Sequence, residues 1–307
     1  MNVASARFAL LVPCKDGASF LPRLFASAAA QTRAFDEIVV FDDGSSDGSS
    51  DVARSLGARV IRSSVNVGPA AARNRLTESS TCEWLHFHDA DDELDPRYLE
   101  RVSSVAGDDT DLILCDMLWL EESTGQVDIR WTYDAAALAS DPASYLIVNP
   151  VGGINGLYRR LTLMEAGGFE ESLRYWEDLD LHLRLAHRRV RTRILNETLV
   201  TAHRREASHS NANLRAVWLA KLGLMERMLP SAPPRLRATL AVEGERVAHR
   251  LAALGHWRDV PTALALCQRA GGNPPSTHST GLRLLKRVLP STVTFGLQAR
   301  LRHHLAR

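Results

Sequence analysis

The chain has 307 residues, of which 45% are hydrophobic and 24% are charged. This length and composition suit a globular protein with one large domain, or one domain and an appendage. The formal net charge of +1 gives no electrostatic case for nucleic acid as a partner, and no apolar run reaches the roughly 20 residues that a transmembrane helix needs.

Short apolar runs alternate with segments of helical spacing through the first third of the chain. The pattern predicts strands at 8–13, 37–43, 58–63, 83–89 and 111–117, separated by helices at 21–31, 47–57, 68–80 and 95–107. Strands and helices that alternate at this spacing predict a parallel α/β sheet with right-handed crossovers. Asp95 is expected to be the N-cap of the last of these helices, with Pro96 directly after it.

The rest of the chain is less regular up to residue 160 and then becomes helical. Helices are predicted at 161–167, 177–188, 212–229, 234–255 and 258–270. We therefore expect an α/β domain over 1–210 with a mostly parallel, Rossmann-like central sheet. This domain is expected to have two halves, about 1–117 and 118–210. A C-terminal helical extension over 211–270 is expected next, and then a linker and tail over 271–307.

Acidic side chains gather where two of the predicted strands end. "DDGSSD" follows the second strand and "DADD" follows the fourth. Ligands bind beyond the carboxyl ends of the strands in parallel sheets, and Mg²⁺ or Mn²⁺ is typically held by one or two carboxylates together with phosphate oxygens. The pattern indicates a metal and phosphate site at this rim. A solvated acidic loop after the fourth strand remains an alternative.

The "DDGSSDGSSD" segment also allows two interpretations. Asp47 and Ser49 could simply form a turn and cap a helix. Alternatively, Asp43 could accept hydrogen bonds from a nucleobase or ribose. The sequence contains neither GxGxxG nor GxxxxGK[ST], so it offers no dinucleotide fingerprint and no P-loop.

A different class of site is suggested by "HFHD", in which His86 and His88 are followed by acidic residues. Two imidazoles and a carboxylate could hold the metal of a hydrolase. Against this, residues two apart on a strand share one face, and that face normally packs against helices in a parallel sheet.

Several motifs together resemble the family 2 inverting glycosyltransferases of GT-A fold. They are "LLVPCKDGASFLPRLFASAAAQTRAFDEIVVFDDGSSDGS", "NVGPAAARN", "WLHFHDADD" and "GLYRRLTLMEAGGFEESLRYWEDLDLHLRLA", which occur in the family's order over about residues 7–210. The resemblance implies a hexosyltransferase that uses a nucleotide diphosphate sugar, with UDP-sugar as the leading donor, and Mn²⁺ or Mg²⁺ as cofactor. A catalytically inactive sugar-binding relative is a further alternative, which the presence of both Asp91 and Asp178 disfavours.

The resemblance assigns roles to individual residues. Its nucleotide-binding and metal-binding candidates are Pro13, Lys15, Asp43, Arg73, Asp89 and Asp91, of which Asp89 and Asp91 form the DxD pair and Asp91 is the main metal ligand. Asp178, the last residue of "WED", corresponds to the catalytic base, which must take the proton of the acceptor hydroxyl. The alternative for Glu177 and Asp178 is that they only favour a helix N-terminus.

The chain also departs from the family's pattern. Lys15 stands where an aromatic residue is frequent, which weakens the case for base stacking there. Near "TAHRREASHS" the chain offers His203, Arg204, Arg205 and His209 for the metal or the diphosphate, and the sequence does not choose among them; His209 is carried as a candidate metal ligand.

The C-terminal residues 282–307 combine recurring leucines with basic residues and contain no acid. A basic amphipathic segment of this kind can lie in the interface of an anionic membrane, although its leucines could instead cover the domain's own core. The family's acceptors imply a glycan, a glycolipid or a lipid-linked sugar. The short N-terminal apolar run and the scattered cysteines predict a cytoplasmic protein, associated with the inner face of the membrane if the tail binds there.

Overall fold

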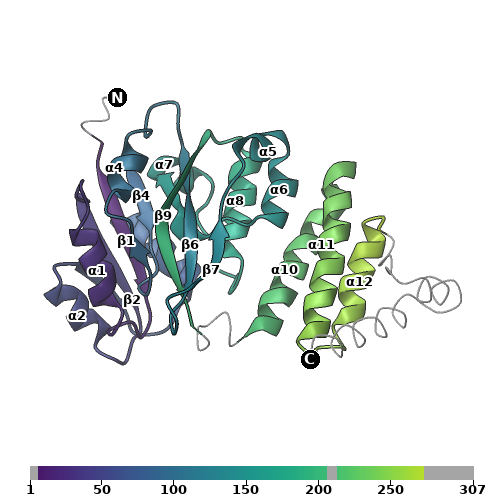
Figure 1. Ribbon diagram of the computed structural model, residues 1–307, viewed down its shortest axis with the longest axis horizontal. Coiled ribbons are helices and arrows are strands. Elements are labelled where there is room, and N and C mark those ends of the chain that lie inside the picture. Colours follow the sequence, from purple (N-terminus) through teal and green to yellow (C-terminus); the bar gives the residue numbers. More distant parts are fainter. Residues whose placement is uncertain (1–5, 206–212, 273–307) are drawn as a thin grey trace, which may run out of the picture. The chain divides into compact units, whose positions relative to one another are not determined.

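The computed structural model describes residues 6–205 and 213–272 of the chain, and these form two compact units (Figure 1). The first unit contains the described residues up to 142 and from 149 to 205. The second contains 143–148 and 213–272. His209 and the tail at 282–307 lie outside the described residues, so the predictions made for them stay predictions.

Four parallel strands make up the first half of the sheet, in the order β3-β2-β1-β4. They are β1 (Phe8–Cys14), β2 (Glu37–Asp43), β3 (Arg59–Ser63) and β4 (Trp84–Phe87), and the connecting helices are α1 (Leu21–Ala29), α2 (Ser49–Ser55) and α3 (Pro69–Ser79). Pro69 suits the first turn of α3, where its missing N–H has no partner to lose. The carboxyl ends of all four strands therefore meet at one rim.

The second half of the sheet is mixed. It contains β6 (Leu112–Glu121), β8 (Gly156–Arg159), β9 (Thr192–Arg204), the short β5 (Glu93–Leu94) and β7 (Val127–Trp131). β8 runs antiparallel between β4 and β6, β9 runs parallel to β6, and β5 and β7 pair antiparallel with β9 and β6. The predicted α/β fold class, with helices following the sheet, is confirmed.

The chain from β4 to β9 contains further α-helices, which are short except for one. They are α4 (Tyr98–Ser103), α5 (Ala135–Ser140), α6 (Pro142–Val148), α7 (Arg160–Glu165) and α8 (Glu177–His187). The prediction that Asp95 is the N-cap of its helix is wrong, because α4 begins at Tyr98. The Asp95 carboxylate instead accepts the N–H of Arg97 at 2.9 Å, forming a turn that precedes the helix.

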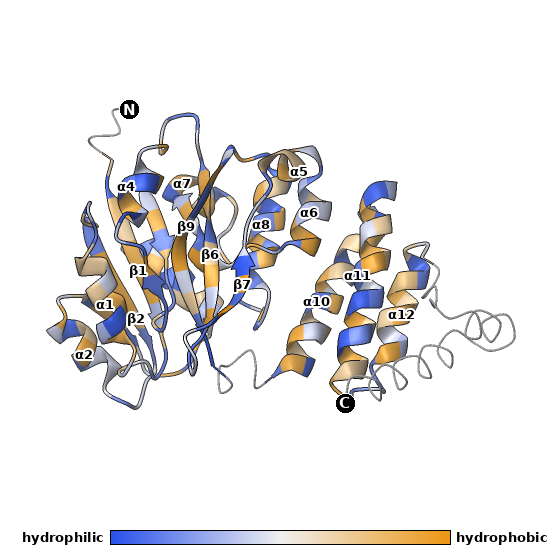
Figure 2. Ribbon diagram, viewed as in Figure 1, coloured by the Kyte–Doolittle hydropathy of each residue, from blue (hydrophilic) through white to orange (hydrophobic). Residues whose placement is uncertain are grey.

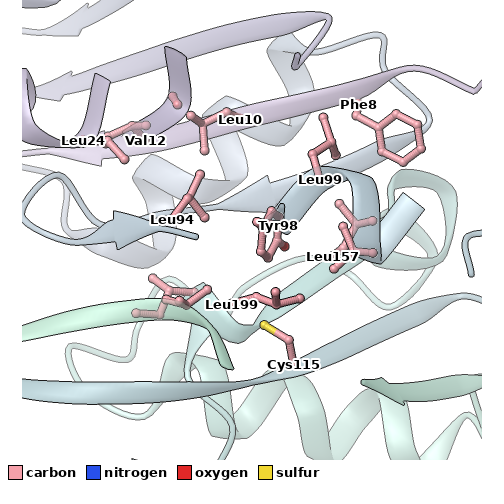
Figure 3. Packing of buried hydrophobic residues seen from close by; sticks show 14 of the residues in the cluster. Phe8, Leu10, Val12, Leu24, Leu94, Tyr98, Leu99, Cys115, Leu157 and Leu199 are labelled. Carbon is pink, nitrogen blue, oxygen red and sulfur yellow. The ribbon is translucent and has the colours of Figure 1, made fainter. Parts of the chain in front are cut away.

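The core of the first unit lies against one face of this sheet (Figure 3). Leu10 and Val12 of β1 pack with Leu24 of α1, and Tyr98 and Leu99 bring α4 into the same cluster. Side chains alternate along a strand, so the intervening residues of β1 face the other side, and α3 packs against β1 and β2. Burying each large side chain is worth roughly 1.5–3 kcal/mol, which fixes the strands whose ends form the rim.

The second unit contains α6 and three longer helices, α10 (Leu214–Met228), α11 (Pro234–Ala253) and α12 (Val260–Arg269). These three each carry hydrophobic and hydrophilic residues (Figure 2). A Cβ on Gly244 of α11 would lie 2.9 Å from Leu266 Cδ2, so glycine permits close packing against α12. None of the helices in 6–205 and 213–272 has the length and apolar character needed to cross a membrane.

Candidate active site

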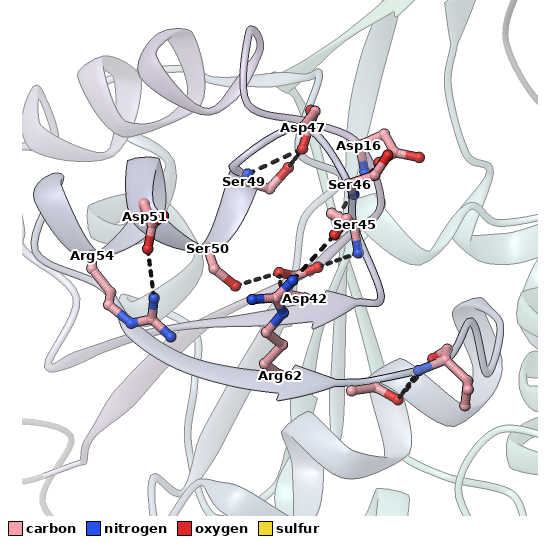
Figure 4. Close-up of polar contacts among 12 residues, drawn as sticks. Asp16, Asp42, Ser45, Ser46, Asp47, Ser49, Ser50, Asp51, Arg54 and Arg62 are labelled. Atoms are coloured by element: carbon pink, nitrogen blue, oxygen red, sulfur yellow. Dashed lines mark hydrogen bonds and ion pairs between the residues drawn. The ribbon is translucent and has the colours of Figure 1, made fainter.

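The acids at and just after the end of β2 are held by the loop around them (Figure 4). The Asp42 side chain is buried and accepts the N–H of Ser45 at 2.7 Å and the hydroxyl of Ser50. Burial opposes ionisation, but these hydrogen bonds outweigh it and lower the pKa of Asp42. Asp42 is therefore an ionised structural residue that shapes the β2–α2 turn.

The loop after β1 is tied to this turn. The Asp16 carboxylate pairs with Lys15 and accepts the N–H of Ser46 at 2.8 Å. Asp47 accepts the N–H of Ala18 and of Ser49, at 2.9 and 3.0 Å. Asp47 is therefore a turn-forming residue, but the expected capping is wrong, because the N-cap of α2 is Gly48 and no side chain caps the helix. The contacts of Asp16 and Asp47 join the two loops at one border of the rim.

Asp43, the candidate base-binding residue, is 5% exposed. Its two carboxylate oxygens accept the N–H groups of Val67 and Gly68, at 2.6 and 2.9 Å, at the start of α3. Each oxygen has a further lone pair, so these contacts leave acceptor capacity for a ligand. Asp43 therefore joins the end of β2 to the loop that precedes α3.

Arg73 of α3 connects two segments that are far apart in the sequence. Its guanidinium donates to Asp89 after β4, at 3.1 Å, and to Glu177 at the start of α8, at 2.6 Å. Arg73 is 6% exposed. Burial opposes its charge, but the carboxylates of Asp89, Glu177 and Asp178 outweigh that effect and raise the pKa of Arg73. One buried cation thus brings the "DADD" and "WED" motifs together.

Asp178, the candidate base, is partly buried in the first turn of α8. Burial and the charge of Glu177 raise the pKa of Asp178 to about 7, although Arg73 opposes the rise. Trp176, immediately before the helix, has a φ of +65°. That conformation is costly for a bulky residue and is found at functional sites. With a pKa of about 7, the Asp178 carboxylate can exchange a proton near neutral pH.

Buried polar residues form hydrogen bonds at the start of α8. His182 Nδ1 lies 2.7 Å from the carbonyl oxygen of Asp178, and its Nε2 lies 3.0 Å from the Tyr158 hydroxyl. Burial lowers the pKa of His182 to about 4, so the ring is neutral at pH 7. A Cβ on Gly156 would lie 2.4 Å from the Tyr158 ring, so only glycine leaves space for it. These contacts fix the backbone that carries Asp178.

The acids after β4 differ from those after β2. Asp91 pairs with Arg205, the residue that follows β9. Burial and the charge of Asp89 raise the pKa of Asp91, against the effect of Arg205. Asp92 is 5% exposed and accepts the N–H of His203 at 2.9 Å, and burial with its acidic neighbours raises its pKa well above the ordinary value. This segment therefore concentrates incompletely compensated negative charge.

The other candidates near the end of β9 have partners outside the DxD pair. His203 Nε2 lies 2.6 Å from Glu93, and Arg204 pairs with Asp128 of β7. Among these residues, Arg205 is the one that contacts Asp91. Pro13 lies in β1 and is partly buried.

His86 and His88 form no open metal site. Both rings are fully buried, and His86 Nε2 lies 3.1 Å from His88 Nδ1. His86 Nδ1 lies 2.6 Å from the Tyr98 hydroxyl and 2.9 Å from the Gly156 carbonyl. Burial lowers the pKa of both histidines. The pair is part of the packed interior, where a hydrolytic metal and its water would have no access.

The chemistry of the rim fits a divalent cation that is shared with a ligand. Within 6–205 and 213–272, no three His, Cys, Asp or Glu side chains form a group that could hold a metal by themselves. Asp91 and Asp89 offer hard oxygen donors at the end of one strand, and Mg²⁺ or Mn²⁺ normally completes such a set with water and phosphate oxygens. The residues fit that arrangement rather than an all-protein cage.

Sequence comparison assigns the family. The model for "Glycosyl transferase family 2" matches residues 9–160, which include Asp43, Arg73 and the DxD pair. The putative glycosyltransferase EpsH of Bacillus subtilis (strain 168) is 34% identical over 131 residues, which are 40% of this chain and 38% of EpsH. These matches support a family 2 glycosyltransferase, and the match to EpsH spans less than half the length of EpsH.

Solved structures agree on the fold. TarS of S. aureus (residues 1–349), crystallised with UDP, superposes with a TM-score of 0.56 at 19% identity, covering 90% of this chain and 95% of that one. The mannosyltransferase PcManGT from Pyrobaculum calidifontis, in complex with GDP-Man and Mn²⁺, gives a TM-score of 0.59 at 16% identity, covering 98% and 88%. At these identities the likeness establishes the GT-A fold alone.

One residue was missed as a site candidate. Glu177 was interpreted only as favouring a helix N-terminus, but it binds Arg73 inside the site. The signal for it was its position beside Asp178 in "WED".

Proposed function

We propose that this protein is an inverting glycosyltransferase that moves a hexosyl group from a nucleotide diphosphate sugar, with UDP-sugar the leading donor, to a hydroxyl group of an acceptor. The observation that carries the proposal is the chain of contacts from Asp89 through Arg73 to Glu177, with Asp178 beside it. A donor-side acid pair and a carboxylate that titrates near neutrality belong to one electrostatic unit. Perturbed acids in such a unit are typical of catalytic sites.

In this mechanism, Asp178 accepts the proton of the acceptor hydroxyl. That oxygen forms a bond to the anomeric carbon of the donor, and the bond from this carbon to the diphosphate breaks on the opposite face, which inverts the configuration. Glu177 and Arg73 hold the first turn of α8, and His182 fixes the carbonyl of Asp178. The raised pKa makes Asp178 a stronger base than an exposed carboxylate.

Asp91 and Asp89 would hold Mn²⁺ or Mg²⁺, which supplies positive charge for the departing diphosphate. Asp43 and the amide groups it organises at the start of α3 border the position proposed for the nucleotide, with Pro13 and Lys15 at the end of β1. PcManGT, which shares the fold, was solved in complex with GDP-Man and Mn²⁺. His209 stays a candidate ligand outside the described residues.

A donor screen tests the proposal. Thermal unfolding of the full chain would be followed with UDP, GDP, CDP and dTDP, each with and without Mn²⁺. We expect one nucleotide, UDP first, to raise the melting temperature more with Mn²⁺ than without it. Asp91→Asn should remove this metal-dependent shift and abolish transfer while the protein stays folded. Undiminished transfer by Asp91→Asn, or in excess EDTA, would contradict the metal assignment.

The acceptor is proposed to be a glycan, a glycolipid or a lipid-linked sugar, and residues 282–307 are proposed to contact an anionic membrane at its cytoplasmic face. The support is the basic, leucine-rich sequence of that segment. Co-sedimentation with anionic vesicles at low salt should be strong for the full chain and weak for a chain that ends at Gly281. Equal binding by the two chains would refute the membrane contact.

A further inference from the structure

Two adjacent arginines at the end of β9 take different partners. Arg204 pairs with Asp128 of β7, whereas Arg205 pairs with Asp91 in the acidic rim. The Arg205 guanidinium carbon also lies 3.9 Å from the centre of the Phe20 ring. Arg205 therefore occupies the rim itself, between the segment after β4 and the loop before α1.

A second arginine organises the surroundings of this pair. Arg23 of α1 donates to the backbone carbonyl of Asp91 and, at 2.9 Å, to Glu122 Oε1. The other oxygen of Glu122 lies 3.4 Å from Arg205 Nε. Among the ion pairs of the described residues, however, the Asp91 carboxylate is paired with Arg205 and not with Arg23. Arg205 is thus the cation that neutralises the principal candidate metal ligand.

We propose that Arg205 is the counter-ion of Asp91 in the nucleotide-free protein and competes with the divalent cation for this carboxylate. The inference rests on the proposed function, because that function makes Asp91 a metal ligand. A cation that approaches alone must displace a charge-assisted pair. A cation that arrives with a diphosphate brings additional oxygen ligands and a balanced charge. Metal and nucleotide should therefore bind cooperatively.

The surroundings allow Arg205 to leave Asp91 without losing all of its partners. Glu122, held in place by Arg23, and the Phe20 ring remain beside the guanidinium. The side chains of Arg205 and Asp91 are 25% and 27% exposed, so the exchange does not require the core to open. Arg205 consequently has two available states, paired with Asp91 or released toward Glu122.

The test is a Mn²⁺ titration of the nucleotide-free full chain, followed by the electron paramagnetic resonance signal of free Mn²⁺. Arg205→Gln removes the competing charge and keeps a polar side chain, although a shorter one. We expect it to lower the Kd for Mn²⁺ about tenfold. Arg204→Gln, one residue earlier, is the matched control and should behave as wild type. Arg205→Lys retains the charge and should also keep weak Mn²⁺ binding.

A second titration in the presence of UDP measures the coupling. UDP should increase Mn²⁺ affinity strongly in the wild type and less in Arg205→Gln, because the competitor is already absent. In the double variant Arg205→Gln, Asp91→Asn the gained affinity should disappear. Thermal melts of each variant confirm that the fold is intact.

Three results would overturn the inference. One is unchanged or weaker nucleotide-free Mn²⁺ binding by folded Arg205→Gln. Another is the absence of measurable binding by both this variant and the wild type. The third is retained affinity in the double variant. If instead none of the four nucleotides bound the wild type, the proposed function would fail, while the nucleotide-free titration would still decide the role of Arg205.

Discussion

The two acid-rich strand ends of this protein look alike in sequence but differ in their electrostatics. After β2, Asp42 and Asp47 accept backbone N–H groups and serine hydroxyls, and these bonds lower their pKa values although burial opposes the change. After β4, Asp91 and Asp92 are desolvated beside other acids, and their pKa values are raised. Asp42 and Asp47 thus build the loops at the first end, whereas Asp91 and Asp92 at the second end retain unfavourable charge that a cation can relieve.

The difference shows what makes an acid available for chemistry. A carboxylate whose charge is satisfied by several donors of the fold contributes to stability. A desolvated carboxylate with too few hydrogen-bond donors has a raised pKa, and it binds a proton or a metal cation more readily. Asp178 belongs to the second kind, since burial raises its pKa to about 7. Substitutions at the two kinds of acid should therefore affect different measurements.

The largest effect is expected for Asp178→Asn. Loss of the general base should reduce turnover by roughly 10²-fold or more, while nucleotide and Mn²⁺ binding persist. Wild-type turnover should rise with pH up to about 7, where Asp178 becomes ionised, and the variant should lose this dependence. The measurement is the initial transfer rate between pH 5.5 and 8.5, with nucleotide affinity determined in parallel.

Asp180→Asn is the matched control for this substitution. Asp180 lies in the same first turn of α8 but pairs with Arg184, at 2.8 Å, so its loss should leave the pH profile unchanged.

The stability of the Asp178→Asn variant gives a second check. The folded protein keeps the Asp178 proton to higher pH than the unfolded chain, so the fold loses stability as pH rises from the ordinary carboxylate range up to the folded pKa of about 7, and this loss is complete above it. Asp178→Asn should thus melt no lower than wild type at pH 8. A parallel fall in donor affinity and turnover would identify Asp178 as structural.

The first half of the fold could be predicted from local pattern. The apolar run of β2 and the helix that starts at Pro69 were predicted to within a residue or two, because each is marked by side chains close in sequence. The strands β5, β7, β8 and β9 and the helices α5 and α6 were not predicted. The residues of β7 are mostly exposed, and no residue of α5 is buried, so periodic burial left no signal there. The N-cap assigned to Asp95 failed because an Asx turn competes with capping for the same carboxylate.

The site could be predicted only in part. Family motifs named Arg73, Asp89 and Asp178, but the pairing of Arg73 with Glu177 joins residues 104 positions apart, and that of Arg205 with Asp91 joins residues 114 apart. Such contacts depend on which strands become neighbours. The parallel pairing of β9 with β6 brings Arg205 to the rim. Nothing in the local sequence specifies that pairing.

A smaller effect, on stability rather than on catalysis, is expected for Asp42→Asn. The substitution keeps the volume of the buried side chain but removes the charge that accepts the Ser45 N–H and the Ser50 hydroxyl. Weakening a buried charge-assisted network should lower the free energy of unfolding by about 1–3 kcal/mol, measured by urea denaturation at pH 7. Because the folded-state pKa of Asp42 is lowered, its contribution is present at neutral pH and is lost as acid protonates it, so the variant and wild type should converge in acid.

Asp51→Asn is the control, since Asp51 is 87% exposed and pairs only with Arg54 in the described contacts. Its loss should change stability by less than about 0.5 kcal/mol. If Asp42→Asn left stability unchanged but weakened nucleotide binding, Asp42 would be a ligand rather than a structural residue, and the contrast between the two strand ends would fail.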